Sequence, residues 1–258
     1  MRAWAASDTG LVRARNEDAY MVLELGDGLA CAVADGLGGM QSGEVAAALA
    51  VEVVRERLAQ HRGTAVPEVL RDAIWAAHHR IQEVGLARRE PMASTLTLAV
   101  LTPGLVIIGH VGDSRAYLFR PGRADEGTAG PGSGKTERIG VLRQLTRDHS
   151  RVGEMVWRGE LTEAQARCHP QRHLLDQAVG AGDRLHVDLL QKELEQGDVV
   201  LLCTDGLTAV VDSSEIAWVL AQGDLPLAAG RLVEMANRRG GPDNVTVVVA
   251  EARWEDNR

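Results

Sequence analysis

The stretch L-A-C-A-V-A-D-G-L-G-G at residues 29–39 places an acidic residue, Asp35, directly after a short apolar run. The run Leu29–Ala34 has the length and composition of a buried strand. The Asp-Gly pair that follows it is typical of a turn. Taken alone, this stretch predicts a strand that ends at Ala34.

The same arrangement recurs elsewhere in the chain. Three further apolar runs are predicted as buried strands and carry an Asp close to one end: Leu105–Val111, followed by Gly112 and Asp113; Val199–Cys203, followed by Thr204 and Asp205; and Val245–Ala250, preceded by Asp243 and Asn244. If the last strand is antiparallel to its neighbours, the four carboxylates meet at one edge of the sheets. Clustered carboxylates repel one another unless cations lie among them. Hard divalent cations such as Mg²⁺ or Mn²⁺ prefer such oxygen ligands, whereas the absence of His and Cys at these positions disfavours zinc.

Further strands and helices are predicted around these runs. Weaker strand candidates are Tyr20–Leu25, Thr95–Leu101, Ala116–Phe119, Val141–Leu145 and His186–Leu190. Helices are expected at Gly43–Gln60, Pro67–Val84, Ser214–Ala221 and Pro226–Asn237. This order is not a regular βαβ alternation, so it favours a layered fold in which helices cover an antiparallel core.

Composition limits the function classes. The chain has 258 residues, of which 45% are hydrophobic, and its formal net charge of −8 is poorly suited to a nucleic-acid backbone. Three cysteines without metal-ligand spacing exclude a disulfide framework. Because no apolar stretch reaches the length of a membrane span and the N-terminus lacks the apolar core of a signal peptide, we expect a cytoplasmic protein without membrane partners. The acidic net charge argues against nucleic-acid partners, and we expect a monomer.

The N-terminal stretch R-A-R-N-E-D at residues 13–18 adds two arginines beside two carboxylates. A solvated charged loop is the ordinary interpretation of such a stretch. Close to a metal cluster, however, a guanidinium offers a bidentate fork for phosphate oxygens. Two metals and an arginine together suit the hydrolysis of a phosphate ester.

In sequence order, these motifs resemble those of the metal-dependent protein phosphatases, the protein phosphatase 2C class, in their bacterial form. The matching motifs are R-x-R-N-E-D at 13–18, A-D-G-L-G-G at 34–39, M-A-S-T at 92–95, V-G-D-S-R at 111–115, L-T-R-D-H-S at 145–150, H-P-Q-R-H-L-L at 169–175, C-T-D-G-L at 203–207 and G-P-D-N-V-T at 241–246. One such motif is weak evidence, but eight in order are specific. They extend over nearly the whole chain.

The resemblance implies an α+β fold: a four-layer α-β-β-α sandwich of two central antiparallel sheets flanked by helix pairs. It implies one phosphatase domain at residues 1–252, followed by a tail at 253–258. A flap at about 150–180 is expected beside the site, and the glycine-rich segment at about 121–140 is expected to be a flexible loop.

The resemblance also implies a role for each site residue. Asp35 would bridge two Mn²⁺ or Mg²⁺ ions, the Gly36 carbonyl would bind one of them, and Asp205 and Asp243 would bind the other. A weaker third ion would lie between Asp113 and Asp205. Glu17 and Asp18 would orient water on the metals. Arg13 would bind the substrate phosphate, with Arg15 as the alternative.

The implied reaction is hydrolysis of phosphoserine or phosphothreonine in proteins by a metal-activated water, without a phosphoenzyme. The partners would be phosphorylated proteins and a cognate bacterial Ser/Thr kinase. Many relatives carry a histidine within or just after D-G-x-G-G that protonates the leaving group, whereas this chain has Leu37 and Met40 there. This departure leaves a second hypothesis open: a low-turnover phosphoprotein-binding or regulatory protein on the same fold.

A third hypothesis concerns A-G-P-G-S-G-K-T at residues 129–136, which satisfies a relaxed phosphate-loop pattern. A true phosphate loop joins a strand to a helix. Here a strand is expected next, at Val141–Leu145, so the local context disfavours a nucleotide-binding regulator.

Overall fold

The computed structural model describes residues 1–26, 28–38, 42–60, 66–122 and 140–255. The strands are β1 (Arg2–Asp8), β2 (Asp18–Leu25), β3 (Gly28–Gly38), β4 (Met92–Ser94), β5 (Leu96–Thr102), β6 (Leu105–Val111), β7 (Arg115–Arg120), β8 (Val141–Gln144), β9 (Asp188–Glu193), β10 (Val199–Cys203) and β11 (Val245–Glu251). The helices are α1 (Ser42–Ala59), α2 (Val66–Arg88), α3 (Arg151–Trp157), α4 (Glu163–Arg167), α5 (Asp205–Thr208), α6 (Ser213–Ala221) and α7 (Leu225–Arg238).

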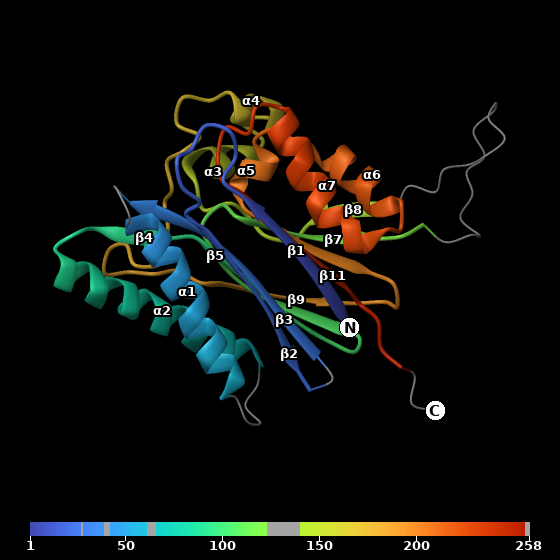
Figure 1. Ribbon diagram of the computed structural model, residues 1–258, viewed down its shortest axis with the longest axis horizontal. Coiled ribbons are helices and arrows are strands. Elements are labelled where there is room, and N and C mark those ends of the chain that lie inside the picture. Colours follow the sequence, from blue (N-terminus) through green and yellow to red (C-terminus); the bar gives the residue numbers. More distant parts are fainter. Residues whose placement is uncertain (27, 39–41, 61–65, 123–139, 256–258) are drawn as a thin grey trace.

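The strands form two antiparallel sheets that pack face to face. One sheet has the order β1-β11-β10-β7-β8, and the other has the order β2-β3-β5-β6-β9, with β4 paired to the far end of β3. Helices α1 and α2 cover the outer face of the second sheet, and α6 and α7 cover the outer face of the first (Figure 1). The predicted α+β sandwich of four layers is therefore confirmed.

Side-chain alternation along the central strands builds three apolar layers. In β10, Val200 and Leu202 face the core between the sheets, whereas Val199, Leu201 and Cys203 face α6 and α7. Strands β3 and β11 divide their side chains in the same way. Because both faces of these strands are covered, their sequences read as continuous apolar runs rather than as alternating ones.

Helix α1 packs on a face of β3 made of small residues. Ala30, Ala32 and Ala34 turn toward this helix, which presents Ala46 and Ala50 among its buried residues. Small side chains on both surfaces allow a close approach, and this brings the start of α1 against the Asp35-Gly36 end of β3.

Several sequence predictions need correction. The strand does not end at Ala34: β3 continues through Asp35 to Gly38, because Gly36–Gly38 pair with β4. Helix α5, which the Asp-Gly pair at 205–206 begins, was not predicted. The last predicted weak strand begins at Asp188 rather than at His186. Strands β1 and β4 and helices α3 and α4 were not predicted, because each is short or lacks a clear apolar period.

Two observations concern the expectations about loops and membranes. Most of the expected flexible loop, residues 123–139, lies outside the described residues, and so does the 129–136 motif. None of the helices in the described ranges is long and apolar enough to cross a membrane.

Candidate functional site

A cavity of about 330 Å³ opens at one end of the sandwich. Seven of the eight predicted site residues line it: Arg13, Glu17, Asp35, Gly36, Asp113, Asp205 and Asp243. They come from the N-terminal loop, β3, the β6–β7 turn, α5 and the loop before β11. The tertiary structure therefore brings together carboxylates that are far apart in the sequence.

Asp35 lies near the end of β3, and Thr95 binds both of its backbone polar groups. Its backbone NH donates to Thr95 Oγ1 at 2.9 Å, and its carbonyl accepts from the Thr95 NH at 2.8 Å. Burial raises the pKa of the Asp35 carboxyl well above its usual value, and the charges of Asp205 and Asp18 raise it further. An ionised Asp35 is thus costly unless a cation compensates its charge.

Gly36 allows the start of α1 to approach Asp35. A Cβ atom at this position would lie 2.0 Å from the Gly43 carbonyl oxygen and 2.7 Å from that of Glu17. The Gly36 NH donates to the Glu17 carbonyl at 3.0 Å. Any larger residue would push the Glu17 loop and α1 away from the cavity.

Asp18 is the predicted site residue that does not line the cavity. It pairs in register with Asp35 across β2 and β3, and its Oδ2 accepts from Thr204 Oγ1 at 2.8 Å. Its Oδ1 is buried without a hydrogen-bond partner among the described residues. Burial raises the pKa of Asp18 to about 7, despite the lowering effect of its hydrogen bonds. Asp18 therefore lies beneath the cavity wall, against Asp35.

Asp205 and Asp243 lie next to the ends of two neighbouring strands of the other sheet, β10 and β11. Asp205 is the first residue of α5, directly after β10 and Thr204, and Asp243 precedes β11. Gly206 permits their approach, since a Cβ there would lie 1.9 Å from the Asn244 carbonyl oxygen. Burial raises the pKa of Asp205, and the charge of Asp243 adds to this effect. The Oδ1 atom of Asp205 is buried and has no hydrogen-bond partner in the described ranges.

Asp113 occupies the turn between β6 and β7. Burial raises the pKa of the Asp113 carboxyl well above its usual value, and the charge of Asp205 raises it further. The neighbouring Ser114 hydroxyl lies 2.8 Å from Thr95 Oγ1, the same atom that accepts from the Asp35 NH. One threonine hydroxyl thus links the turn of Asp113 to the strand of Asp35.

The two candidate arginines differ in their placement. Arg13 lines the cavity, is half exposed, and donates from Nη2 to Asp243 Oδ2 at 2.8 Å. Arg15 does not line the cavity; its guanidinium lies 3.9 Å from Glu44 Oε2 on α1. This geometry favours Arg13 as the phosphate ligand.

Asn244 is a residue whose role the sequence analysis missed. Its Oδ1 accepts from the Glu17 NH at 2.8 Å, and its Nδ2 donates to the Thr9 and Arg15 carbonyls, both at 2.8 Å. These three bonds hold the N-terminal loop against the cavity. Its position directly after Asp243 in a quoted motif was the available signal.

Two residues of the segment predicted to form a flap line the cavity. His173 and Leu175, in the segment between α4 and β9, contribute to its lining. Leu37 also lines the cavity, whereas Met40, the other residue at a position where the resemblance implied a histidine, lies outside the described residues. The described residues thus place an apolar side chain and a flap histidine beside the acidic groups.

The donor set fits hard divalent cations. In the part of the chain that the structure describes, two carboxylate oxygens, Asp18 Oδ1 and Asp205 Oδ1, are buried without hydrogen-bond partners. The pKa values of Asp35, Asp113 and Asp205 are raised by burial and by the charges of neighbouring aspartates. Among the described residues, no three His, Cys, Asp or Glu side chains already converge as one complete ligand set. Spaced carboxylates around a wide cavity suit Mg²⁺-type ions, which keep several water ligands.

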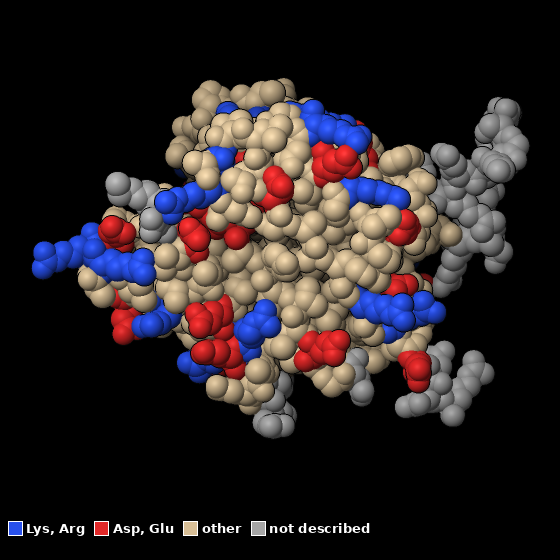
Figure 2. All heavy atoms as spheres, in the orientation of Figure 1, with Lys and Arg blue, Asp and Glu red and all other residues tan. Residues whose placement is uncertain are grey.

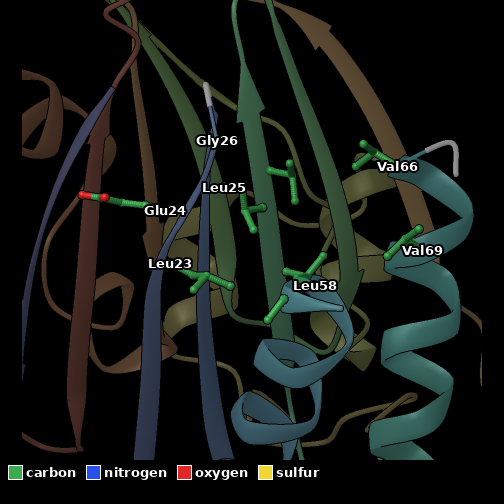
Figure 3. A pocket seen from close by; sticks show the side chains of 9 residues that line it. Leu23, Glu24, Leu25, Gly26, Leu58, Val66 and Val69 are labelled. Atoms are coloured by element: carbon green, nitrogen blue, oxygen red, sulfur yellow. The ribbon is translucent and has the colours of Figure 1, made fainter. Parts of the chain in front are cut away.

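A second cavity, of about 430 Å³, lies between the end of β2 and the ends of α1 and α2 (Figure 3). Leu23, Leu25, Leu58 and Val69 turn toward it, whereas Glu24 points to the opposite side of its strand (Figure 3). On the molecular face shown in Figure 2, acidic and basic side chains are interspersed. Of these two cavities, the one with Asp35 has the charged groups that chemistry on a charged substrate needs.

Comparisons with known proteins agree with this geometry. A family model described as protein phosphatase 2C matches residues 12–223. The serine/threonine protein phosphatase PstP of Mycobacterium tuberculosis is 36% identical over 256 residues, which are 97% of this chain and 45% of that protein. The serine/threonine phosphatase stp of Listeria monocytogenes is 32% identical over 97% of this chain and 96% of its own length. The chain thus spans about half the length of PstP and nearly all of stp.

Solved structures show the same fold. The crystal structure of the Mycobacterium tuberculosis serine/threonine phosphatase PstP/Ppp superposes with a TM-score of 0.82 at 35% identity, covering 98% of this chain and 99% of that one. A catalytic domain of PstP in complex with two manganese ions superposes with a TM-score of 0.79 at 34% identity, covering 97% of each chain. The matched motifs, the two-sheet sandwich and the acidic cavity at its end lead to one assignment: the chain belongs to the protein phosphatase 2C family.

Proposed function

We propose that this protein is a metal-dependent serine/threonine phosphatase that hydrolyses phosphoserine and phosphothreonine in proteins. The observation that carries the proposal is the convergence of four aspartates and Arg13 on one cavity. The names of the relatives, which are bacterial serine/threonine phosphatases, support the same reaction.

Each aspartate has a proposed role that follows from its place. Asp35, with Gly36 beside it, would hold both cations of a binuclear Mn²⁺ or Mg²⁺ site, and Asp205 and Asp243 would bind one of them. The charge of Asp205 raises the pKa of the Asp113 carboxyl. Asp113 and Asp205 would share a weaker third cation. When bound, the cations would supply Lewis acidity that activates a water nucleophile and offsets phosphate charge. The two-manganese structure of PstP supports a binuclear site.

Arg13 would bind the substrate phosphate at the rim of the cavity. Its side chain is half exposed and pairs with Asp243, so the guanidinium can turn toward an entering phosphate without leaving the acidic cluster. A guanidinium binds a phosphate through two parallel hydrogen bonds. This contact offsets charge on the phosphate oxygens.

Glu17 and Asp18 would orient water on the cations. Glu17 lines the cavity, and burial raises the pKa of its carboxyl. Asp18 lies next to Asp35 across β2 and β3, and burial raises its pKa to about 7 in the metal-free protein. Divalent cations beside these carboxylates favour the ionised, acceptor-only form, which can hold water in a fixed orientation.

A second candidate function is a low-turnover phosphoprotein-binding or regulatory protein on the same fold. Leu37, an apolar residue in the cavity wall, favours it, because a leucine cannot protonate a seryl leaving group. The complete set of carboxylates favours the phosphatase.

We further propose a single domain at 1–252 with a substrate-selecting flap at 150–180, a monomeric state, a cytoplasmic location, and substrates phosphorylated by a cognate Ser/Thr kinase. The deciding experiment measures phosphate release from a phosphothreonine peptide by the purified chain, with Mn²⁺ and with EDTA. Turnover in Mn²⁺ that EDTA removes supports the phosphatase. Tight peptide binding without phosphate release supports the second candidate.

A further inference from the structure

The short segment Asp148–Ser150, between β8 and α3, connects the flap to the sandwich. Asp148 binds the Arg115 guanidinium through both carboxylate oxygens, with Nη2 to Oδ2 at 2.7 Å. Ser150 caps α3 by accepting from the Gly153 NH at 3.1 Å. His149 lies between them, and its contacts reach the turn that carries Asp113.

His149 binds Gly112 twice. The His149 NH donates to the Gly112 carbonyl at 2.7 Å, and the Gly112 NH donates to the His149 Nδ1 at 3.2 Å. The other ring nitrogen, Nε2, lies 3.1 Å from Asp188 Oδ2 at the start of β9. The His149 carbonyl accepts from the Asp176 NH of the flap at 2.8 Å. One residue therefore joins the Asp113 turn, the flap and the edge strand β9.

These contacts determine which ring nitrogen carries the proton. An amide NH can only donate, so Nδ1 must accept from Gly112 and carries no proton. The ring proton therefore lies on Nε2, which donates to Asp188. Only this tautomer makes both bonds at once, so Asp188 selects the form of His149 that binds the Gly112 amide.

The turn held by His149 has little freedom on its other side. Gly112 has a φ of +111°, and a Cβ there would lie 2.6 Å from Thr95 Cβ. Thr95 in turn binds Asp35 and lies 2.8 Å from the Ser114 hydroxyl. The turn is thus clamped between Thr95 on the Asp35 side and the His149 ring on the flap side.

We propose that His149 is a positioning residue: its Nδ1 holds the Gly112 amide and thereby places the Asp113 carboxyl in the cavity. The proposal rests on the proposed function, in which Asp113 binds a cation. The alternative is that the ring merely fills space, since it is 10% exposed and packs on His110 with ring centroids 4.7 Å apart. The two explanations differ in whether the Nδ1 acceptor itself matters.

Two substitutions at His149 distinguish the positioning explanation from the space-filling explanation. In His149→Asn, the amide oxygen occupies the place of Nδ1 and can still accept from Gly112, while the bond to Asp188 is lost. In His149→Gln, the longer side chain reaches toward Asp188 but places no acceptor at Nδ1. Both variants remove the ring and its packing, so they are matched for the space-filling explanation.

The first readout is amide hydrogen exchange by NMR in metal-free and Mg²⁺-loaded protein. We expect the Gly112 amide to exchange about tenfold faster in His149→Gln than in the wild type, and to stay within about threefold in His149→Asn. The Val179 amide, which donates to the Ser94 carbonyl at 2.8 Å, is the internal reference for global opening. Equal effects of the two substitutions on Gly112, or parallel changes at Val179, overturn the proposal.

A second readout uses the wild type alone and does not depend on a variant that folds. Long-range ¹H–¹⁵N spectra of the imidazole should show an unprotonated Nδ1 and a protonated Nε2 for His149. A proton on Nδ1 is incompatible with the bond from Gly112 and rejects the proposal.

The third readout is the Mn²⁺ concentration for half-maximal phosphatase activity, which should rise several-fold in His149→Gln and stay near the wild-type value in His149→Asn. The exchange and imidazole measurements need no turnover. A wild type without phosphatase activity thus contradicts the proposed function and leaves those two tests of His149 intact.

Discussion

At the scale of single residues, the cavity concentrates negative charge in a partly buried place. The pKa values of Asp35, Asp113 and Asp205 are raised first by burial and then by neighbouring carboxylates. Arg13 is the basic group that lines this cavity, and it pairs with Asp243. The chemistry therefore depends on groups whose charge must be balanced from outside the chain.

Removing one ligand charge tests the metal assignment. Asp35→Asn and Asp243→Asn should abolish Mn²⁺-stimulated phosphate release while leaving the circular dichroism spectrum unchanged, because an amide keeps one acceptor oxygen but no charge. Asp183→Asn, at an exposed position outside the cavity, is the matched control and should keep full activity. Wild-type activity in either cavity variant would mean that the carboxylate is not a metal ligand.

The two arginines provide their own internal comparison. Arg13→Ala should raise KM for a phosphopeptide by roughly ten- to hundredfold with little change in Mn²⁺ affinity, because the lost contact is a charge-assisted pair to the phosphate. Arg15→Ala should change KM by less than about threefold, since its nearest acidic partner is Glu44, outside the cavity. Steady-state kinetics with both variants measure these changes in KM. A larger rise in KM for Arg15→Ala than for Arg13→Ala would assign phosphate binding to Arg15.

Leu37 leads to a prediction about the leaving group. A seryl alkoxide leaves poorly without a proton, whereas nitrophenolate leaves readily. The wild type should therefore have a higher kcat on p-nitrophenyl phosphate than on a phosphoserine peptide. Met40→His, at the other departing position, should raise kcat for the peptide selectively, by at most about 10²-fold. Equal changes on the two substrates would show that another group already supplies the proton.

At the scale of elements, the site depends on close backbone contacts where elements meet. Gly36 brings α1 against the end of β3, and Gly206 brings α5 against the loop before β11. In both places the neighbouring atom is a backbone carbonyl, which cannot move aside as a flexible side chain can. The positions of Asp35 and Asp205 therefore follow from element packing as much as from their own side chains.

Gly206→Ala tests this packing. Its Cβ would lie 1.9 Å from the Asn244 carbonyl oxygen, so we expect a loss of about 1–3 kcal/mol in the free energy of unfolding, with reduced activity. Gly230→Ala in α7 is the control: no atom lies within 4 Å of its added Cβ, and alanine favours the helix by about 1 kcal/mol. Urea denaturation should give opposite signs for the two variants, and a neutral Gly206→Ala would contradict the close contact.

At the scale of the whole molecule, the cavity lies where the two sheets meet. Asp35 comes from the sheet with β3, whereas Asp205 and Asp243 flank strands of the sheet with β10 and β11. The remainder of the sheet interface is apolar, formed by residues such as Val33, Leu202 and Val248. Cations bound in the cavity would therefore join the two halves of the sandwich at their polar end.

The whole molecule should consequently be stabilised by divalent cations in a pH-dependent way. Four aspartates have raised pKa values in the folded state: Asp18, Asp35, Asp113 and Asp205. Protonation of these groups favours the folded state and ionisation disfavours it, whereas metal binding requires ionised ligands. The gain in unfolding free energy from Mg²⁺ over EDTA should thus grow as pH rises through the Asp18 pKa of about 7. At a free Mg²⁺ concentration a hundredfold above Kd, it should reach about 2.7 kcal/mol. Thermal unfolding at several pH values measures it, and a gain that falls with rising pH contradicts the metal site.

The sequence predicted the four strong strands, the long helices and the family with little error. Strands β6 and β10 have the predicted ends, because apolar runs bounded by Asp or Gly determine where a buried strand can extend. The strand-end aspartates were also recognisable, because an Asp recurs near one end of all four strong strands and clustered carboxylates need cations among them. Short elements such as β1, β4 and α4 were not predictable, because their stability comes from neighbours rather than from their own pattern.

The sequence by itself determined the fold class and the family, and it predicted seven residues that line one cavity in the structure. Only the tertiary structure decided that β3 continues past Asp35, that Asp18 lies beneath the cavity wall while Glu17 lines it, and that Arg13 rather than Arg15 reaches Asp243. The roles of Asn244 and Thr95 also emerged only there. The physical reason is that hydrophobic periodicity is a local property of the chain. The direction of a polar side chain depends on hydrogen-bond partners that are hundreds of residues away in the sequence, such as the Glu17 NH bound by Asn244.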